Sequence, residues 1–172
     1  GRVLFLDYLL QYTEQQVNLQ TFSNLAEAET VFHQMEENEY LPPSQKSKIL
    51  SIIRKKALND LYQGVPSPQE FIDIKAILDS VTWLQSDSYE IYSSYLARGL
   101  LANIEAKTFS NLAAAHSFYD MFMNNENLAQ SDKELISASL TRKTVKDVYG
   151  ENPSPAKIAE LQDMIADLNV SC

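Results

Sequence analysis

The hexapeptide Thr-Phe-Ser-Asn-Leu-Ala occupies residues 21–26 and returns unchanged at residues 108–113, a shift of 87 positions. The match continues without a gap, and residues 21–83 share 19 identities in 63 aligned pairs, about 30%, with residues 108–170. An ungapped match of this length with several multi-residue runs indicates an internal duplication. The sequence therefore predicts two copies of one unit, and these are residues 1–86 and residues 87–172.

Positions that stay apolar in both copies recur every three or four residues, which is the period of a helix buried on one face. One such stripe runs from Phe22 through Phe32 to Met35, and its counterpart runs from Phe109 to Phe122. Four stripes per copy predict four helices per unit. We expect helices near residues 3–19, 23–38, 44–63 and 67–84, and then near 88–106, 110–125, 131–149 and 154–169.

The predicted fold class is all-α. No strand-like alternation competes with the helical period, and only 4 of 172 residues are glycine, which disfavours folds rich in tight β-turns. The connections are short, so neighbouring helices are expected to run roughly antiparallel. We expect two tandem four-helix units packed end to end or side by side. Trp83, near the end of the first copy, is expected to pack between the units, and the alternative is that its ring stacks on a ligand.

Two sequence patterns predict where helices begin. The repeated hexapeptide is expected to start a helix, with its Thr or Ser as the cap and its Phe and Leu as anchors. Ser67 and Pro68 with Glu70 have the spacing of a capping box, and the second copy keeps Ser154 but has Lys157 in place of the glutamate.

Charge and composition exclude several classes of partner. The chain has 23 acidic and 14 basic residues, a formal charge of -9, and such a balance repels phosphate backbones and anionic lipid surfaces. No apolar run approaches the roughly 18 residues of a membrane span. We therefore expect no nucleic acid partner and no membrane insertion. Composition and charge do not indicate in which cellular compartment the protein is located.

The chain does not begin as a translation product would, because its first residues are Gly1 and Arg2. It is therefore expected to be a segment of a longer polypeptide, such as a surface or effector protein carrying further copies of the unit.

No residue pattern indicates catalysis or a cofactor. The two histidines, His33 and His116, stand in no glycine-rich elbow or strand-to-helix turn, and no glycine-rich phosphate loop is present. Cys172, the single cysteine, is the last residue, which excludes an internal disulfide and makes a poor nucleophile. We expect a protein that is not an enzyme.

Two histidine–carboxylate pairs are candidate ligands for a metal ion or a small molecule. Glu29 and His33 are four residues apart, as are His116 and Asp120, and the 87-residue shift aligns one pair with the other. Spacing of four places both groups on one helical face, where each pair offers half of a metal or small-molecule site. The simpler interpretation is a contact within one helix on a solvated face.

Basic residues gather in the third predicted helix of each unit. Lys55 and Lys56 lie in the first copy, and Lys143 and Lys146 lie in the second. In an acidic chain they form a candidate patch for binding an acidic partner protein. The alternative is a helix surface that pairs with neighbouring carboxylates such as Asp60.

A repeated helical architecture without catalytic motifs favours a module for protein–protein interaction, scaffolding or spacing. The alternative is a small-molecule or metal-binding helical protein that uses the Glu29/His33 and His116/Asp120 pairs.

Overall fold

The computed structural model describes residues 1–150 and 152–170, and these residues contain eight α-helices, one 3-10 helix and no strand. The prediction of an all-α fold is confirmed. In chain order the elements are α1 (Arg2–Leu19), α2 (Leu25–Glu36), α3 (Pro43–Leu61), α4 (Pro68–Ser80), η1 (Thr82–Asp87), α5 (Ser88–Ala106), α6 (Leu112–Met123), α7 (Gln130–Tyr149) and α8 (Pro155–Val170). Cys172 lies outside the described residues.

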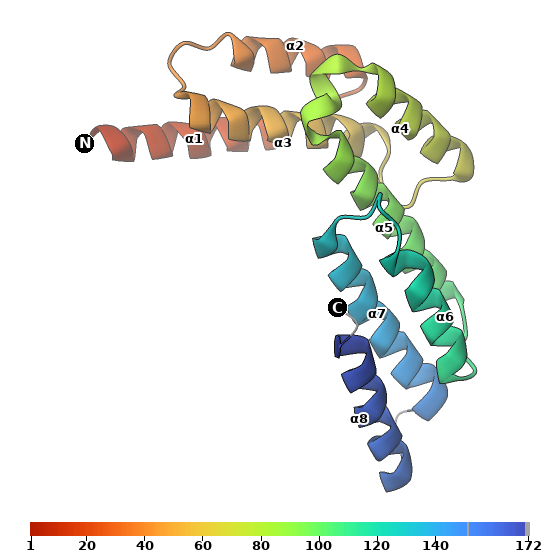
Figure 1. The fold of residues 1–172 in the computed structure, drawn as a ribbon. Coiled ribbons are helices and arrows are strands. Elements are labelled where there is room, and N and C mark those ends of the chain that lie inside the picture. Colours follow the sequence, from red (N-terminus) through yellow and green to blue (C-terminus); the bar gives the residue numbers. More distant parts are fainter. Residues whose placement is uncertain (151, 171–172) are drawn as a thin grey trace. The chain divides into compact units, whose positions relative to one another are not determined.

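The chain divides into two compact units, unit 1 (Gly1–Ile91) and unit 2 (Tyr92–Cys172). In unit 1, α3 packs against α1 and α2, and η1 contacts both α3 and α4. The direction of the chain reverses from α1 to α2 and again from α2 to α3 (Figure 1). In unit 2, α7 packs against α6 and α8. None of the described helices is long and apolar enough to cross a lipid bilayer.

Each unit has its own apolar core. The core of unit 1 joins the apolar stripes of α2 and α3, and Phe32, Ile49 and Ile53 are almost completely buried there. In unit 2, Phe122, Ile136 and Leu140 lie in a core built by α5, α6 and α7.

The repeated hexapeptide does start a helix, but the capping residue is its asparagine. Asn24 Oδ1 accepts a hydrogen bond from the backbone N–H of Glu27 at 2.9 Å, and Asn111 Oδ1 accepts one from Ala114 at 2.9 Å. The prediction of a Thr or Ser cap is therefore wrong. The helices begin at Leu25 and Leu112, two residues later than predicted.

Replacing Asn24 by alanine is expected to lower the free energy of unfolding by about 1 kcal/mol, because the N–H of Glu27 loses its acceptor at the helix start. Urea denaturation followed by Trp83 fluorescence measures this change. Ser23→Ala is the matched control and is expected to have little effect. An equal loss in both variants would contradict the assignment of Asn24 as the cap.

The predicted capping box at the start of α4 is confirmed. Ser67 Oγ accepts from the N–H of Glu70 at 3.2 Å, and the Glu70 carboxylate accepts from the N–H of Ser67 at 3.1 Å. The second copy keeps only the first half of this arrangement, since Ser154 Oγ accepts from the N–H of Lys157 at 3.4 Å.

The predicted helix over residues 67–84 ends earlier, at Ser80. Val81 is extended, with φ -88° and ψ 107°, and the chain then continues as η1. Val81 and Thr82 are both β-branched, which disfavours continuation of an α-helix. The Arg54 side chain also donates to the Trp83 carbonyl at 2.7 Å, so a contact from α3 helps hold the new direction.

A contact between the start of α2 and the end of α3 has a counterpart 87 residues later. Asp60 accepts from the N–H of Phe22 at 2.9 Å and pairs with Lys56 at 2.9 Å. In unit 2 the equivalent bonds join Asp147 to the N–H of Phe109 at 3.0 Å and to Lys143 at 2.6 Å. We call each Lys-Asp-Phe arrangement a clamp. The clamp of unit 1 ties the segment before α2 to the end of α3, and the clamp of unit 2 ties the segment before α6 to the end of α7.

Candidate functional site

Unit 1 contains a groove of about 470 Å³ where α2, α3 and η1 meet. Its lining combines carboxylates, an imidazole, a guanidinium and aromatic rings. The lining residues are Glu29, Phe32, His33 and Glu36 of α2, Arg54 of α3, Thr82, Trp83 and Ser86 of η1, and Val81 before η1.

Aromatic side chains form the apolar part of the groove. The Phe32 ring is buried in the core, and the half-buried Trp83 ring lies against it with the ring centroids 5.1 Å apart. The Arg54 guanidinium lies 4.9 Å from the centroid of the Phe32 ring, within the range of a cation–π contact. The structure thus packs Trp83 on Phe32 within unit 1, a contact that the sequence does not predict.

Polar contacts from α3 hold η1 at the edge of the groove. Arg54 donates to the Trp83 carbonyl and also pairs with the Asp87 carboxylate at 3.0 Å. Ser51 Oγ donates to the same carboxylate at 3.1 Å. The side chains of the ion pair are only 14% and 13% exposed, so water screens it less than a surface pair. These bonds fix the position of the Trp83 backbone relative to α3.

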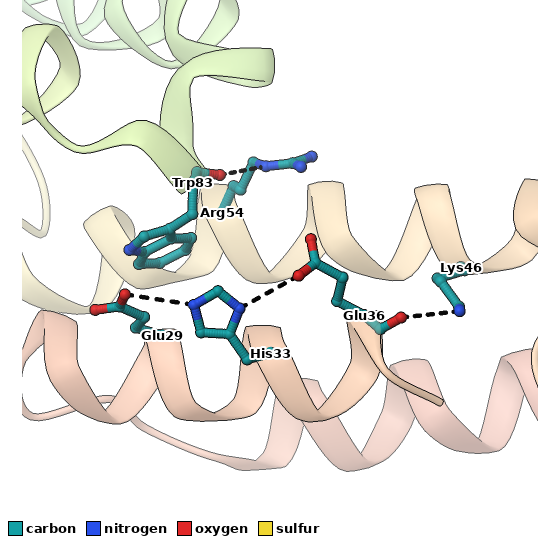
Figure 2. Close-up of polar contacts among 6 residues, drawn as sticks. All are labelled: Glu29, His33, Glu36, Lys46, Arg54 and Trp83. Carbon is teal, nitrogen blue, oxygen red and sulfur yellow. Dashed lines mark hydrogen bonds and ion pairs between the residues drawn. The ribbon is translucent and has the colours of Figure 1, made fainter. Parts of the chain in front are cut away.

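The imidazole of His33 lies between two carboxylates, as Figure 2 shows. Its Nε2 is 3.4 Å from Glu29 Oε1, and its Nδ1 is 3.3 Å from Glu36 Oε1. The contact with Glu36, followed by that with Glu29, raises the pKa of His33 above its ordinary value of 6.5, although desolvation opposes the shift. The sequence predicted the Glu29 contact but missed Glu36, whose spacing of three residues from His33 was the available signal.

The His33 imidazole is therefore expected to titrate above pH 6.5 in the folded protein. NMR titration of its ring C–H resonances measures the pKa directly. Glu36→Gln is expected to move the pKa of His33 down, because it removes the largest stabilising contact of the imidazolium. A pKa at or below 6.5 in the unsubstituted protein, or no change in the variant, would contradict the arrangement in Figure 2.

The second histidine–carboxylate pair is also formed, within α6 of unit 2. His116 Nδ1 lies 3.2 Å from Asp120 Oδ2, and both side chains are more than half exposed. Among the described residues, no group of three or more His, Cys, Asp or Glu side chains is arranged to hold a metal ion. Each predicted pair thus forms a contact within one helix.

The four lysines of the predicted basic patch have different surroundings. Lys56 and Lys143 are the half-buried cations of the two clamps, and Lys143 also donates to the Lys107 carbonyl at 2.6 Å. Lys55 is exposed and pairs with Glu90 at 2.8 Å, and the Glu90 contact raises the pKa of Lys55. Lys146 is exposed at the end of α7. Lys55 and Lys146 are therefore the two members with solvated side chains.

Helix α1 presents a second feature, an exposed row of large apolar side chains. Leu4, Phe5, Tyr8 and Tyr12 are each more than half exposed, and their spacing places them along one side of the helix. Exposed apolar surface that is contiguous rather than scattered is typical of interaction sites.

The groove residues differ between the copies, whereas the clamp residues do not. An 87-residue shift from Phe32, Arg54 and Glu36 gives Tyr119, Thr141 and Met123. Trp83 corresponds to Val170. The combination of Phe32, Arg54, Glu36 and Trp83 is thus found in the first copy only, although the positions of Glu29 and His33 again carry an imidazole and a carboxylate in the second. Both copies keep the residues of the clamp.

The fold and the site together define an all-helical protein with a groove of mixed acidic and aromatic character on its first unit. No protein-family model matches the chain, and no curated protein or solved structure matches it.

Proposed function

We propose that this chain is a non-catalytic helical-repeat module, built of two tandem four-helix units, that binds another protein through the groove of unit 1. The proposed copies are residues 1–86 and 87–172. Beyond the all-α fold, we thus propose that one helical unit is duplicated and that the duplicated scaffold binds a partner.

The duplication is supported by local contacts that recur 87 residues apart. The Asn24 cap corresponds to the Asn111 cap, with backbone angles that agree within 2°. The two clamps use the same residue types and atoms. Recurrence of long-range contacts as well as short motifs is expected when two copies share one packing arrangement.

The binding role is carried by one observation, the contrast between clamp residues that are identical in the two copies and groove-lining residues that differ between them. Residues needed only for folding are expected to recur in both units, as Asp60 and Asp147 do. Trp83, Arg54 and Glu36 have no equivalents of the same type in the second copy. Side chains that are free to differ between copies while lining a concave surface are the best candidates for recognition.

The test is capture of partner proteins from a lysate of the source cells, with a groove-filling variant. Ser86 lines the groove and is exposed, so Ser86→Phe is expected to block the groove without disturbing the core. Gln85→Phe, one residue outside the lining, is the matched control. A partner retained by the control and lost by Ser86→Phe supports the proposal. Identical partner lists for the two variants would overturn the groove as the binding surface.

The basic patch is tested in the same experiment by Lys55→Glu and Lys146→Glu, since reversal at Lys56 or Lys143 would also break a clamp. Loss of the partner in these variants but not in Ser86→Phe would move the binding surface to the patch. Metal analysis of untagged protein tests the metal-binding alternative. A tight stoichiometric metal held by Glu29 and His33, or by His116 and Asp120, would overturn the proposal.

A further inference from the structure

We propose that the groove of unit 1 binds a lysine or arginine side chain presented by an extended segment of the partner protein. This inference rests on the proposed function and deepens it, since it specifies the chemistry of the partner that the groove recognises.

The first support is unused hydrogen-bonding capacity on two carboxylates. Glu29 and Glu36 each use Oε1 to contact His33. No described residue donates a hydrogen bond to Oε2 of either side chain, and both side chains are about half exposed. A carboxylate that keeps a free oxygen beside a groove is an acceptor for an ammonium or guanidinium group, with which it forms a charge-assisted hydrogen bond.

The second support is the negative charge that remains at the groove once the basic groups paired within the protein are set aside. Arg54 lines the groove, but its guanidinium is paired with Asp87 and bonded to the Trp83 carbonyl. Lys46 donates to the backbone carbonyl of Glu36 at 2.9 Å, and so occupies the end of α2 (Figure 2). Two carboxylates and one titratable imidazole then face the groove. A cation is the complementary ligand whenever that imidazole is neutral.

The third support is the aromatic surface beside these carboxylates. Trp83 is the best of the aromatic residues for attracting a cation to its ring face. The neighbouring Phe32 ring already holds the Arg54 guanidinium at 4.9 Å, so this site accommodates a cation against an aromatic ring within its own structure. Aliphatic parts of a lysine or arginine side chain also gain by contact with Trp83 and Val81.

The groove fits a peptide segment better than a free small cation. Its volume of about 470 Å³ exceeds that of one lysine side chain, so flanking residues of the segment are accommodated beside Thr82 and Ser86. Both of these residues are exposed at the groove. A free amine of small size would leave most of this space filled only with water.

Binding is expected to weaken as the pH falls through the titration of His33. The charged groups that face this imidazole are Glu29 and Glu36 from α2 and Arg54 from α3, and η1 contributes no titratable side chain to the lining. An imidazolium between the two carboxylates competes with the ligand for their negative charge. The expected result is weaker binding of a cationic peptide at pH 5.5 than at pH 8.

The experiment uses the intrinsic fluorescence of Trp83, which is the single tryptophan of the chain and lines the groove. Capped pentapeptides with a central Arg, Lys, Gln or Glu and flanking Gly and Ser residues are titrated into the full chain. The Arg and Lys peptides are expected to bind at least about fivefold more tightly than the Gln peptide, as one cation–π contact implies. Equal affinity for the Arg and Gln peptides would overturn the cationic assignment.

Matched variants assign the effect to the groove. Glu29→Gln and Glu36→Gln are each expected to reduce the affinity for the Arg peptide up to about fivefold, because each removes one half-exposed ion pair with the ligand. Glu37→Gln, adjacent to Glu36 but outside the lining, is expected to leave the affinity unchanged. Circular dichroism confirms that each variant is folded. An equal loss in Glu37→Gln would show that the effect is general charge attraction and would overturn the assigned site.

Two further outcomes separate this inference from the proposed function. If a partner protein is captured and lost with Ser86→Phe while no peptide preference exists, the cationic chemistry is wrong and the proposed function stands. If free arginine or spermidine binds as tightly as the Arg peptide, the ligand is a small cation, and the choice of a peptide segment is overturned.

Discussion

Replacing Phe32 by alanine is expected to lower the free energy of unfolding by about 3–5 kcal/mol. The Phe32 ring is 2% exposed and lies in the core of unit 1. It contacts Trp83 at a ring centroid distance of 5.1 Å and supports the Arg54 guanidinium. Truncation therefore removes core packing, an aromatic pair and a cation–π contact at once.

Urea denaturation monitored by far-ultraviolet circular dichroism measures this loss, and Trp83 emission reports the change at the groove. The emission is expected to shift to longer wavelength in Phe32→Ala, because the indole loses the ring against which it packs. Phe32→Tyr is the matched control, since tyrosine stands at the equivalent position 119 of the second copy. A loss below about 1 kcal/mol in Phe32→Ala would contradict the central packing role of this ring.

The apolar stripe of α2 could be predicted from the sequence because it depends on helical periodicity alone. Ala28 and Phe32 are buried in the structure, as their spacing indicated. The groove could not be predicted in the same way. It requires the chain to leave helical geometry at Val81 and to pack Trp83 on Phe32, which lies 51 positions earlier in the sequence. Contacts between such distant residues leave no periodic signal in a single sequence.

The basic residues also show that short-range pairs could be predicted from the sequence whereas contacts between distant residues could not. The spacing of four between Lys56 and Asp60 indicated a pair, and that pair is present. The hydrogen bond from the N–H of Phe22 to the same carboxylate joins residues 38 positions apart, and no periodic pattern in the sequence indicates such a contact. A lysine that appeared to belong to a surface patch is therefore a half-buried member of a clamp.

Replacing Asp60 by alanine is expected to lower the free energy of unfolding by about 3 kcal/mol. The Asp60 side chain is 10% exposed and accepts from both the Phe22 N–H and the Lys56 ammonium. Its removal leaves a backbone donor without an acceptor and a half-buried cation without its counter-ion. Both groups are costly when they are kept from water.

Chemical denaturation of Asp60→Ala and of the double variant Asp60→Ala/Lys56→Met measures this effect. The double variant also removes the unpaired cation, so it is expected to recover part of the loss, while the Phe22 N–H remains without its acceptor. Lys75→Met, which breaks an exposed pair with Asp79, is the control and is expected to cost less than about 1 kcal/mol. Equal losses in the control and in Asp60→Ala would contradict the clamp.

The equivalent clamp of unit 2 adds a dependence on pH. The hydrogen bonds from Lys143 and then from the Phe109 N–H lower the pKa of Asp147 below its ordinary value of 3.8. A carboxyl whose pKa is lower in the folded than in the unfolded state stabilises the fold above the unfolded value, and this contribution is lost as the pH falls through the folded value. Stability is therefore expected to decrease below about pH 4.

In Asp147→Asn this part of the acid dependence is expected to be absent, and comparison of denaturation midpoints between pH 2 and pH 6 measures it. Identical pH profiles for the variant and the unsubstituted protein would show that the clamp carboxylate does not control this transition.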